Sequence, residues 1–169
     1  MQKATTWSEA IITKYPEQVA VAIAKDAAGK HNPISLGWAM QTSHKPPMLA
    51  FSVGLTRYSL GVIRAAKEFV VALPSAEQEA EVMLFGTKSG RDTDKLAEAG
   101  AKTRPAAKID SVLLADAVAN FECRLAGELA TGDHVIFVGE VVCSYVNEKR
   151  LNRLYTVGPG PKMAGLPQG

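Results

Sequence analysis

The sequence predicts a mainly β domain with short helices between its early strands, closed into a barrel. Short runs rich in valine, isoleucine and phenylalanine recur along the chain, turn-forming clusters separate them, and the last third holds two long runs. So many strands in 169 residues create sheet edges that must be covered or paired, which favours a barrel. The length corresponds to one domain, residues 1–169.

The first half alternates predicted strands with one helix. Gln18 to Lys25 is rich in valine and alanine, and the cluster from Asp26 to Lys30 is typical of a hairpin turn. The return segment, Pro33 to Ser43, carries polar side chains among apolar ones but no acid or arginine. Met48 to Val53 is the next predicted strand, and the apolar spacing that follows predicts a helix around residues 60–67.

The second half begins with a strand, Phe69 to Leu73, which Pro74 stops. Ser75 and Gln78 form a capping-box pattern that starts a helix ending near Gly86. After a polar loop, a short helix is expected from about Asp92 to Ala99, and Gly100 would end it. The residue runs 117–126 and 134–146 predict two long strands, with the chain turning between residues 127 and 133.

Charge and composition exclude several classes of protein. The chain has 19 Lys and Arg against 17 Asp and Glu, and these charges are spread evenly, which argues against a nucleic-acid binder. Apolar runs are too short for a membrane span, and the first residues lack a secretory signal, so we expect a soluble, cytoplasmic protein. Cys123 and Cys143 are then expected to be free thiols.

Common catalytic motifs are missing from the sequence. It contains no Gly-x-Gly-x-x-Gly after a strand, no phosphate-binding Gly-x-x-x-x-Gly-Lys loop, no Gly-x-Ser-x-Gly and no His-Glu-x-x-His. His31, His44 and His134 are dispersed and do not suggest a metal site.

Three polar segments in this apolar chain predict a pocket for a flat, partly polar ligand that carries a phosphate. Ser35 to Ser43 offers hydroxyls, amides and an indole to a heteroaromatic ring, although an edge strand with outward polar residues explains the same composition. Gly54 to Ser59 precedes a helix, where free amides favour an anion, but Thr56 or Ser59 as a plain helix cap is the alternative.

The third segment runs from Ser89 to Lys95. Arg91 and Lys95 flank a helix start, where cations oppose the helix dipole, so an anionic partner is indicated; neighbouring aspartates could instead pair with them. His134 opens a strongly apolar strand, where it would donate to a ring carbonyl or to a nicotinamide, unless it is simply a turn residue.

Taken together, these segments resemble the flavin reductase-like, FMN-binding split-barrel proteins, which include flavoredoxin and the reductase components of two-component monooxygenases. The likeness rests on three stretches in a matching order: Asn32-Pro33-Ile34-Ser35-Leu36-Gly37-Trp38 running to Ser43-x-x-Pro46-Pro47, then Tyr58-Ser59 with Glu68-Phe69-Val70-Val71-Ala72-Leu73-Pro74, then Phe121-Glu122-Cys123 with Gly132-Asp133-His134-x-Ile136-x-x-Val138-Gly139-Glu140-Val141.

The resemblance implies a six-stranded antiparallel split β-barrel, with a core of about residues 12–158 and a C-terminal tail of about 159–169, that binds FMN as a homodimer. It implies His134 as the residue facing the ring. The implied cofactor-binding set is Ser35, Leu36, Gly37, Trp38, Ala39, Thr42, Ser43, Ser52, Val53, Tyr58, Ser59, Ser89, Arg91, Lys95 and His134. The phosphate role predicts that replacing Arg91 and Lys95 by Ala weakens FMN binding more than riboflavin binding.

The resemblance also implies a function. The first hypothesis is a flavin reductase that transfers a hydride from NAD(P)H to FMN and passes electrons to an acceptor protein or monooxygenase. The alternative is a non-enzymatic, flavoredoxin-like electron carrier that a protein partner reduces. A small barrel for single-stranded nucleic acid is disfavoured by the near-neutral charge.

The C-terminal segment departs from the family pattern. Related chains often end in an aromatic segment that covers the flavin, whereas here Tyr155 is the aromatic residue of the stretch from Leu154 to Met163. How the ring is covered is therefore left open by the sequence.

Overall fold

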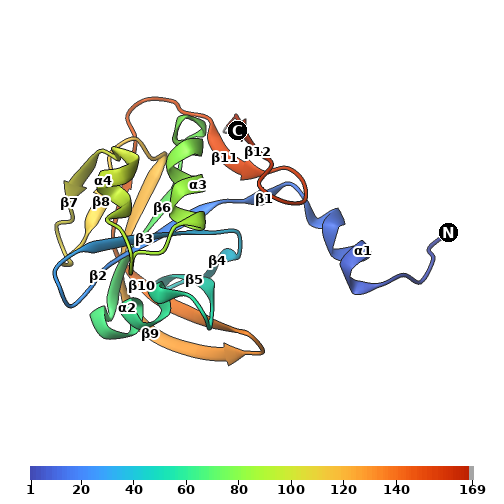
Figure 1. Cartoon of the computed structure of the whole chain (residues 1–169), viewed down its shortest axis with the longest axis horizontal. Coiled ribbons are helices and arrows are strands. Elements are labelled where there is room, and N and C mark those ends of the chain that lie inside the picture. The colour runs from blue at the N-terminus through green and yellow to red at the C-terminus, as the bar shows by residue number, and fades with distance from the viewer. Residues whose placement is uncertain (168–169) are drawn as a thin grey trace.

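The computed structural model describes residues 1–167, and its centre is a seven-stranded antiparallel sheet in the order β3-β2-β6-β9-β10-β5-β4 (Figure 1). The mainly β class with short helices is confirmed. The strands are β2 (Ala20–Lys25), β3 (His31–Leu36), β4 (Ala39–His44), β5 (Pro47–Gly54), β6 (Glu68–Leu73), β9 (Ala119–Thr131) and β10 (His134–Val146).

The sheet has seven strands where the sequence predicted six, because the return segment after the first hairpin breaks in two. Its first part pairs with β2 as β3, whereas its second part pairs with β5 as β4. The break falls at Gly37 and Trp38, and the Trp38 carbonyl accepts a hydrogen bond of 2.9 Å from the Ser52 amide. The chain therefore crosses from one edge of the sheet to the other at this point.

This crossing closes the sheet into a barrel that stays split on one side. β3 and β4 are the two end strands in the sheet order, and among the described strands β3 pairs with β2 alone. In an antiparallel strand, successive backbone groups alternate between the two edges. Part of the β3 backbone therefore faces the gap toward β5, and this gap is the split of the barrel.

Helices flank the split. α2 (Tyr58–Ala66) follows β5, while α3 (Glu79–Thr87) and α4 (Lys95–Ala99) pack against β3. The predicted capping box at Ser75 is present and starts a short 3-10 turn, η2 (Ala76–Gln78), before α3. α4 ends at Gly100 in the left-handed conformation, as expected, with φ of 63°.

The start of α4 differs from the sequence prediction. The helix begins at Lys95 rather than Asp92, because the Asp94 carboxylate accepts a hydrogen bond of 3.2 Å from the Ala97 amide and acts as the N-cap. The segment before it, from Ser89 to Asp94, is a turn-rich loop at the mouth of the split.

The β9–β10 hairpin is longer than the sequence indicated. The strands continue to Thr131 and resume at His134, so the turn consists of Gly132, with φ of 58°, and Asp133. The end of β9 is exposed and carries mainly polar or small residues, so no buried pattern marks it as a strand. Pairing to β10, which also pairs with β5, holds it in place.

The barrel interior is built around three phenylalanines. The Phe51 ring meets Phe69 edge-on at 4.9 Å and lies 5.9 Å from Phe137, measured between ring centroids. Cys123 lies in the same core, where burial raises the pKa of its thiol to about 12. Both cysteines are free, Cys123 buried and Cys143 partly exposed.

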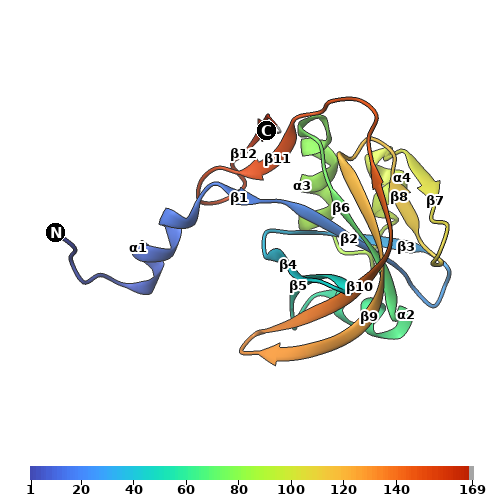
Figure 2. The same ribbon diagram turned by 180° about the vertical axis from the view of Figure 1, so that it is seen from behind.

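The terminal segments form structure outside the barrel. β1 (Glu17–Gln18), β11 (Arg153–Thr156) and β12 (Met163–Leu166) make a small second sheet, and β12 lies within the predicted tail. β7 (Thr103–Pro105) and β8 (Val112–Leu114) pair separately. Before β1, α1 (Trp7–Ile11) stands clear of the body, and η1 (Ile12–Lys14) connects it to the barrel (Figures 1 and 2). Across the described residues, every helix is too short or too polar to cross a membrane.

Candidate functional site

Four neighbouring cavities lie in and beside the split between β3 and β5. The anion pocket, of about 220 Å³, is lined by the start of α2 and the loop after α3; the central pocket, of about 190 Å³, is lined by β3 and the end of β5. The Trp38 pocket measures about 560 Å³, and the Met163 pocket about 250 Å³. Neighbouring pockets share lining residues, so they form one groove. The anion and central pockets share Ile34 and Arg57, and the central and Trp38 pockets share Gly37, Trp38 and His134. The central and Met163 pockets share Ser35, Leu36 and Gly37.

The anion pocket contains the uncapped N-terminus of α2. Arg57 is the N-cap residue, and its side chain makes no capping hydrogen bond. The hydroxyl of Ser59 instead accepts a hydrogen bond of 2.8 Å from the buried Asn32 amide group. Thr56 and Ser59 are therefore not side-chain caps, and the first amides of this nine-residue helix can bind an anion.

Basic side chains surround this helix start. Arg57, Lys88, Arg91 and Lys95 all line the anion pocket. The Arg91 guanidinium lies 5.6 Å from the centre of the Tyr58 ring, and the Arg91 amide donates to the Ser89 hydroxyl at 3.2 Å. These contacts hold the loop from Ser89 to Asp94 over the start of α2, and they place the positive charge of Arg91 beside the helix.

Tyr58 is itself held in position by an acid. Its hydroxyl donates to the Asp26 carboxylate at 3.2 Å. Burial, the Asp26 charge and this hydrogen bond raise the pKa of Tyr58. The phenol therefore stays neutral and supports Arg91 with its ring.

Lys95 is a buried cation with one protein acceptor. Its side chain is 3% exposed, and its ammonium group donates to the Phe85 carbonyl at 3.1 Å. Burial lowers the pKa of Lys95 to about 8, and the nearby charges of Lys30 and Arg57 lower it further in the same direction. An unbalanced positive field of this kind is relieved by a bound anion.

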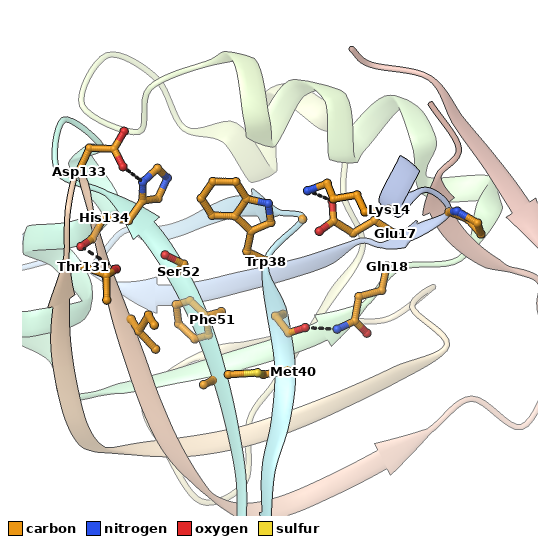
Figure 3. Close-up of a pocket in the computed structure, with 15 residues that line it drawn as sticks. Lys14, Glu17, Gln18, Trp38, Met40, Phe51, Ser52, Thr131, Asp133 and His134 are labelled. Carbon is orange, nitrogen blue, oxygen red and sulfur yellow. Dashed lines mark hydrogen bonds and ion pairs between the residues drawn. The ribbon is translucent and has the colours of Figure 1, made fainter. Parts of the chain in front are cut away.

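The other end of the groove is aromatic. The His134 and Trp38 rings lie 4.7 Å apart between centroids, tilted by 44° (Figure 3). His134 is the first residue of β10, opposite Gly54 of β5, and its Nδ1 lies 2.7 Å from the Asp133 carboxylate. This hydrogen bond lowers the pKa of Asp133 and leaves Nε2 on the side of Gly54 and the central pocket.

The Trp38 pocket extends beyond this aromatic pair. Phe51 and Ile136 line it with apolar side chains, and Met40 lies at its mouth. The segment before β2 forms one wall (Figure 3). On that wall the Lys14 ammonium lies 5.3 Å from the Trp38 ring and 2.7 Å from the Glu17 carboxylate, so its charge is balanced. The pocket falls within the size range of small-molecule sites, about 300–1,000 Å³.

The structure brings most of the predicted site residues together. Tyr58, Ser59, Ser89, Arg91 and Lys95 line the anion pocket; Ser35, Leu36, Gly37, Trp38, Val53 and His134 line the central pocket; and Ala39 and Ser52 line the Trp38 pocket. The Ser35 hydroxyl donates to the Val82 carbonyl at 2.6 Å, so this residue faces the groove mainly with its backbone.

Two predicted residues are not brought to the groove. Thr42 and Ser43 lie farther along β4, after a register irregularity between Gln41 and Ser43, and they line none of the four pockets. The sequence placed them with residues 35–39 because the turn at Gly37 and Trp38 was not apparent. β4 therefore carries them away from the split.

Other lining residues were missed by the sequence analysis. They include Ile34, Phe51 and Lys88, and from the N-terminal side Lys14, Pro16, Glu17 and Gln18. Gln18 donates to the Ala39 carbonyl and accepts from Arg153 at 2.7 Å, which fixes this wall to both β4 and β11. These residues share no local motif, so only tertiary contact reveals them.

The C-terminal hairpin covers one flank of the groove without an aromatic residue. Tyr155 lies against the Arg153 guanidinium at 5.2 Å and lines none of the four pockets. Thr156, Pro161 and Met163 instead form the outer wall of the Met163 pocket, opposite Val82 and Met83 of α3. The cover on this side is therefore aliphatic.

A split β-barrel whose groove is cationic at one end and aromatic at the other defines a binding protein for a flat ligand that carries a phosphate. The chain belongs to the flavin reductase-like family, since the model of the flavin reductase-like domain matches residues 12–158. The fold is the split barrel seen in the solved structures of an FMN-binding protein and a flavoredoxin.

One relative and two solved structures illustrate what the chain is similar to. An uncharacterised protein of Archaeoglobus fulgidus is 34% identical over 113 residues, which are 67% of this chain and 64% of that protein, less than two thirds of its length. The FMN-binding protein from Thermus thermophilus with bound 1-cyclohex-2-enone has a TM-score of 0.84 at 24% identity, covering 98% of this chain and 94% of that one. The flavoredoxin of Desulfovibrio vulgaris has a TM-score of 0.85 at 20% identity, covering 100% of this chain and 95% of that one.

Proposed function

We propose that this protein is an FMN-dependent oxidoreductase that takes a hydride from NADH or NADPH and passes the electrons to an acceptor. One observation carries the proposal. The groove along β3 opens into the much larger Trp38 pocket, which leaves room for a second planar ring beside the cofactor site. A site that held only a buried cofactor would not need this space.

The residues of the groove fit FMN. The phosphate would bind at the amides that begin α2, with Arg57, Lys88 and Arg91 around it, because a phosphate dianion balances this concentration of positive charge. The ribityl chain would follow the shared wall of Ile34 and Arg57. The ring system would lie along the backbone of residues 35–38, beside the Trp38 indole.

Bound FMN would supply the chemistry of hydride acceptance and onward electron transfer. The protein contributes position and shielding. Trp38 and the apolar side chains of its pocket would hold the nicotinamide against the cofactor ring and exclude water. The Asp133 carboxylate accepts from Nδ1 of His134 and orients the ring, so that Nε2 would accept from the N–H of the nicotinamide carboxamide. Hydride transfer itself requires no protein acid or base, so the role of these side chains is to position the two rings.

The test is anaerobic mixing of the FMN-loaded protein with NADH or NADPH, followed by the visible absorbance of oxidised flavin. Bleaching within seconds with one of the two donors supports the reductase. A matched variant, Val146→Ala, changes a residue that is 76% exposed at the opposite end of β10 and should bleach at the same rate. A protein that retains no flavin after incubation in saturating FMN and removal of the free cofactor would overturn the proposal.

A flavoredoxin-like carrier is the second candidate, and the exposure of the site favours it. Trp38 is 49% exposed and Met40 55% exposed at the mouth of the pocket, so a redox protein could contact this edge directly. Flavin that binds tightly, does not bleach with either nicotinamide and bleaches with a reduced iron–sulfur protein would support the carrier. We further propose that the working form is a homodimer joined near this exposed mouth.

A further inference from the structure

The N-terminal arm, residues 1–13, has no packing surface of its own. A capping box forms helix α1: the Glu9 amide donates to the Thr6 hydroxyl at 3.3 Å, and the Thr6 amide donates to the Glu9 carboxylate at 3.2 Å. None of the five helical residues is buried, and Trp7 is 77% exposed. Among the described residues, the side-chain hydrogen bonds recorded for residues 5–13 all stay within the arm.

A helix of this size needs a surface to pack against. Isolated helices shorter than about 12–15 residues are marginal in water. Trp7 and Ile11 are four residues apart, so they lie on one face of the helix and give it an apolar side. Figures 1 and 2 show from both sides that this helix points away from the barrel, so its own body does not cover that face.

The base of the arm is a wall of the Trp38 pocket. Lys14, Pro16, Glu17 and Gln18 line the pocket, whose mouth exposes Trp38 and Met40. The molecule thus presents two uncovered apolar features at one place, the helix face and the pocket mouth.

A two-fold axis near the arm base would bring these features together. In an isologous dimer the same surface patch is used by both subunits. If the arm bases lie beside the axis, each arm base is next to the pocket mouth of the other copy. Trp7 lies nine positions before Pro16, which at about 1.5 Å per helical residue gives a reach of at least about 13 Å.

We infer that in the homodimer each N-terminal arm docks on the second copy of this chain, where Trp7 closes the mouth of the Trp38 pocket. The inference rests on the proposed homodimer and adds a residue from the partner copy to the nicotinamide side of the site. The pocket is then incomplete in a single chain, and the arm controls which donors or acceptors reach the aromatic end of the groove.

Photo-crosslinking in the full-length protein tests the contact. Benzoylphenylalanine replaces Trp7, and protein labelled with ¹⁵N is mixed with unlabelled protein and allowed to exchange subunits before irradiation. We expect crosslinked peptide pairs of mixed isotope content that join residue 7 to residues 38–51 or 131–136. The matched control carries the same group at Val146, which is equally exposed but lies at the far end of β10, and should give no such pairs.

A fluorescence measurement gives an independent readout. The chain has two tryptophans, so Trp7→Phe and Trp7→Ala each leave Trp38 as the single emitter. Acrylamide should quench Trp38 about twofold more strongly in Trp7→Ala than in Trp7→Phe, because loss of an aromatic cover admits solvent to the contact. Sedimentation of both variants reports the oligomeric state.

The outcomes separate this inference from the proposed function. A dimer with no mixed-isotope crosslinks to the pocket, or with equal quenching of Trp38 in the two variants, overturns the docking of the arm and leaves the homodimer standing. A protein that sediments as a monomer overturns both the docking of the arm and the homodimer. Bleaching of FMN by NADH or NADPH is measured separately and does not depend on either result.

Discussion

The Trp38 indole and the His134 imidazole lie 4.7 Å apart at the point where the central pocket opens into the Trp38 pocket. They come from opposite sides of the split, Trp38 from the turn between β3 and β4 and His134 from the start of β10. Closure of the barrel therefore creates an aromatic junction between the cofactor site and the second cavity. The first prediction concerns this junction.

Replacing Trp38 by Ala should weaken FMN binding about tenfold, because an aromatic contact contributes about 0.5–1.5 kcal/mol beyond its buried area. Trp38→Phe should retain most of the affinity. Titration of the apo protein with FMN, followed by flavin fluorescence, measures both variants. Unchanged affinity in Trp38→Ala would place the ring system elsewhere.

Arg91→Ala should weaken the binding of FMN but not that of riboflavin. The Arg91 guanidinium lies in the anion pocket, where it would bind the phosphate. Its removal should lower the affinity for FMN about tenfold or more, which is the usual contribution of a charge-assisted hydrogen bond. The affinity for riboflavin, which has no phosphate, should be unchanged. The control is Arg104→Ala, which removes the same charge from exposed β7. Isothermal titration with both ligands measures the effect, and equal losses for both ligands would remove the phosphate role.

Lys95 should make stability depend on pH in the apo protein. Its folded pKa of about 8 lies below the ordinary value of 10.5, so between these pH values the unfolded chain binds a proton that the folded chain lacks. The free energy of unfolding therefore rises from pH 8 to pH 10.5, by up to about 3 kcal/mol.

The measurement is urea unfolding of the wild-type chain and of Lys95→Met across this pH range. The variant should show the smaller rise, because its side chain carries no charge. Saturating FMN should flatten the rise in the wild-type protein, since a bound phosphate keeps the ammonium protonated. A wild-type slope identical to that of Lys95→Met would show that Lys95 is not the group responsible.

Gly90→Ala should disturb the anion pocket through packing. A Cβ at this position would lie 1.9 Å from Oδ1 of the buried Asn32, whose amide group donates to Ser59 at the start of α2. We expect a loss of about 1–3 kcal/mol in the free energy of unfolding, typical of overpacking, together with weaker FMN binding. Gly127→Ala is the matched control, because a Cβ there meets nothing within 4 Å. Equal midpoints of urea unfolding for the two variants would contradict the prediction.

Local sequence patterns correctly predicted the elements that neighbouring residues in the chain determine. The apolar runs of β2, β5 and β6, the capping box at Ser75 and the helix stop at Gly100 all depend on neighbouring residues, and the structure confirms them. The extension of β9 to Thr131 has no local cause, because pairing with β10 holds it, and the sequence analysis missed it. The same reason explains why the break at Gly37 and Trp38 was not predicted.

The sequence by itself determined the family, the run of strands and most residues of the groove, because these follow from short-range spacing and from motifs that lie in order along the chain. The tertiary structure alone decided that Lys95 is a buried cation, that Thr42 and Ser43 turn away from the groove, and that Lys14 to Gln18 form a wall of the Trp38 pocket. These properties depend on which distant segments meet when the barrel closes. Burial, charge balance and pocket shape are sums over such contacts, so no single stretch of sequence contains them.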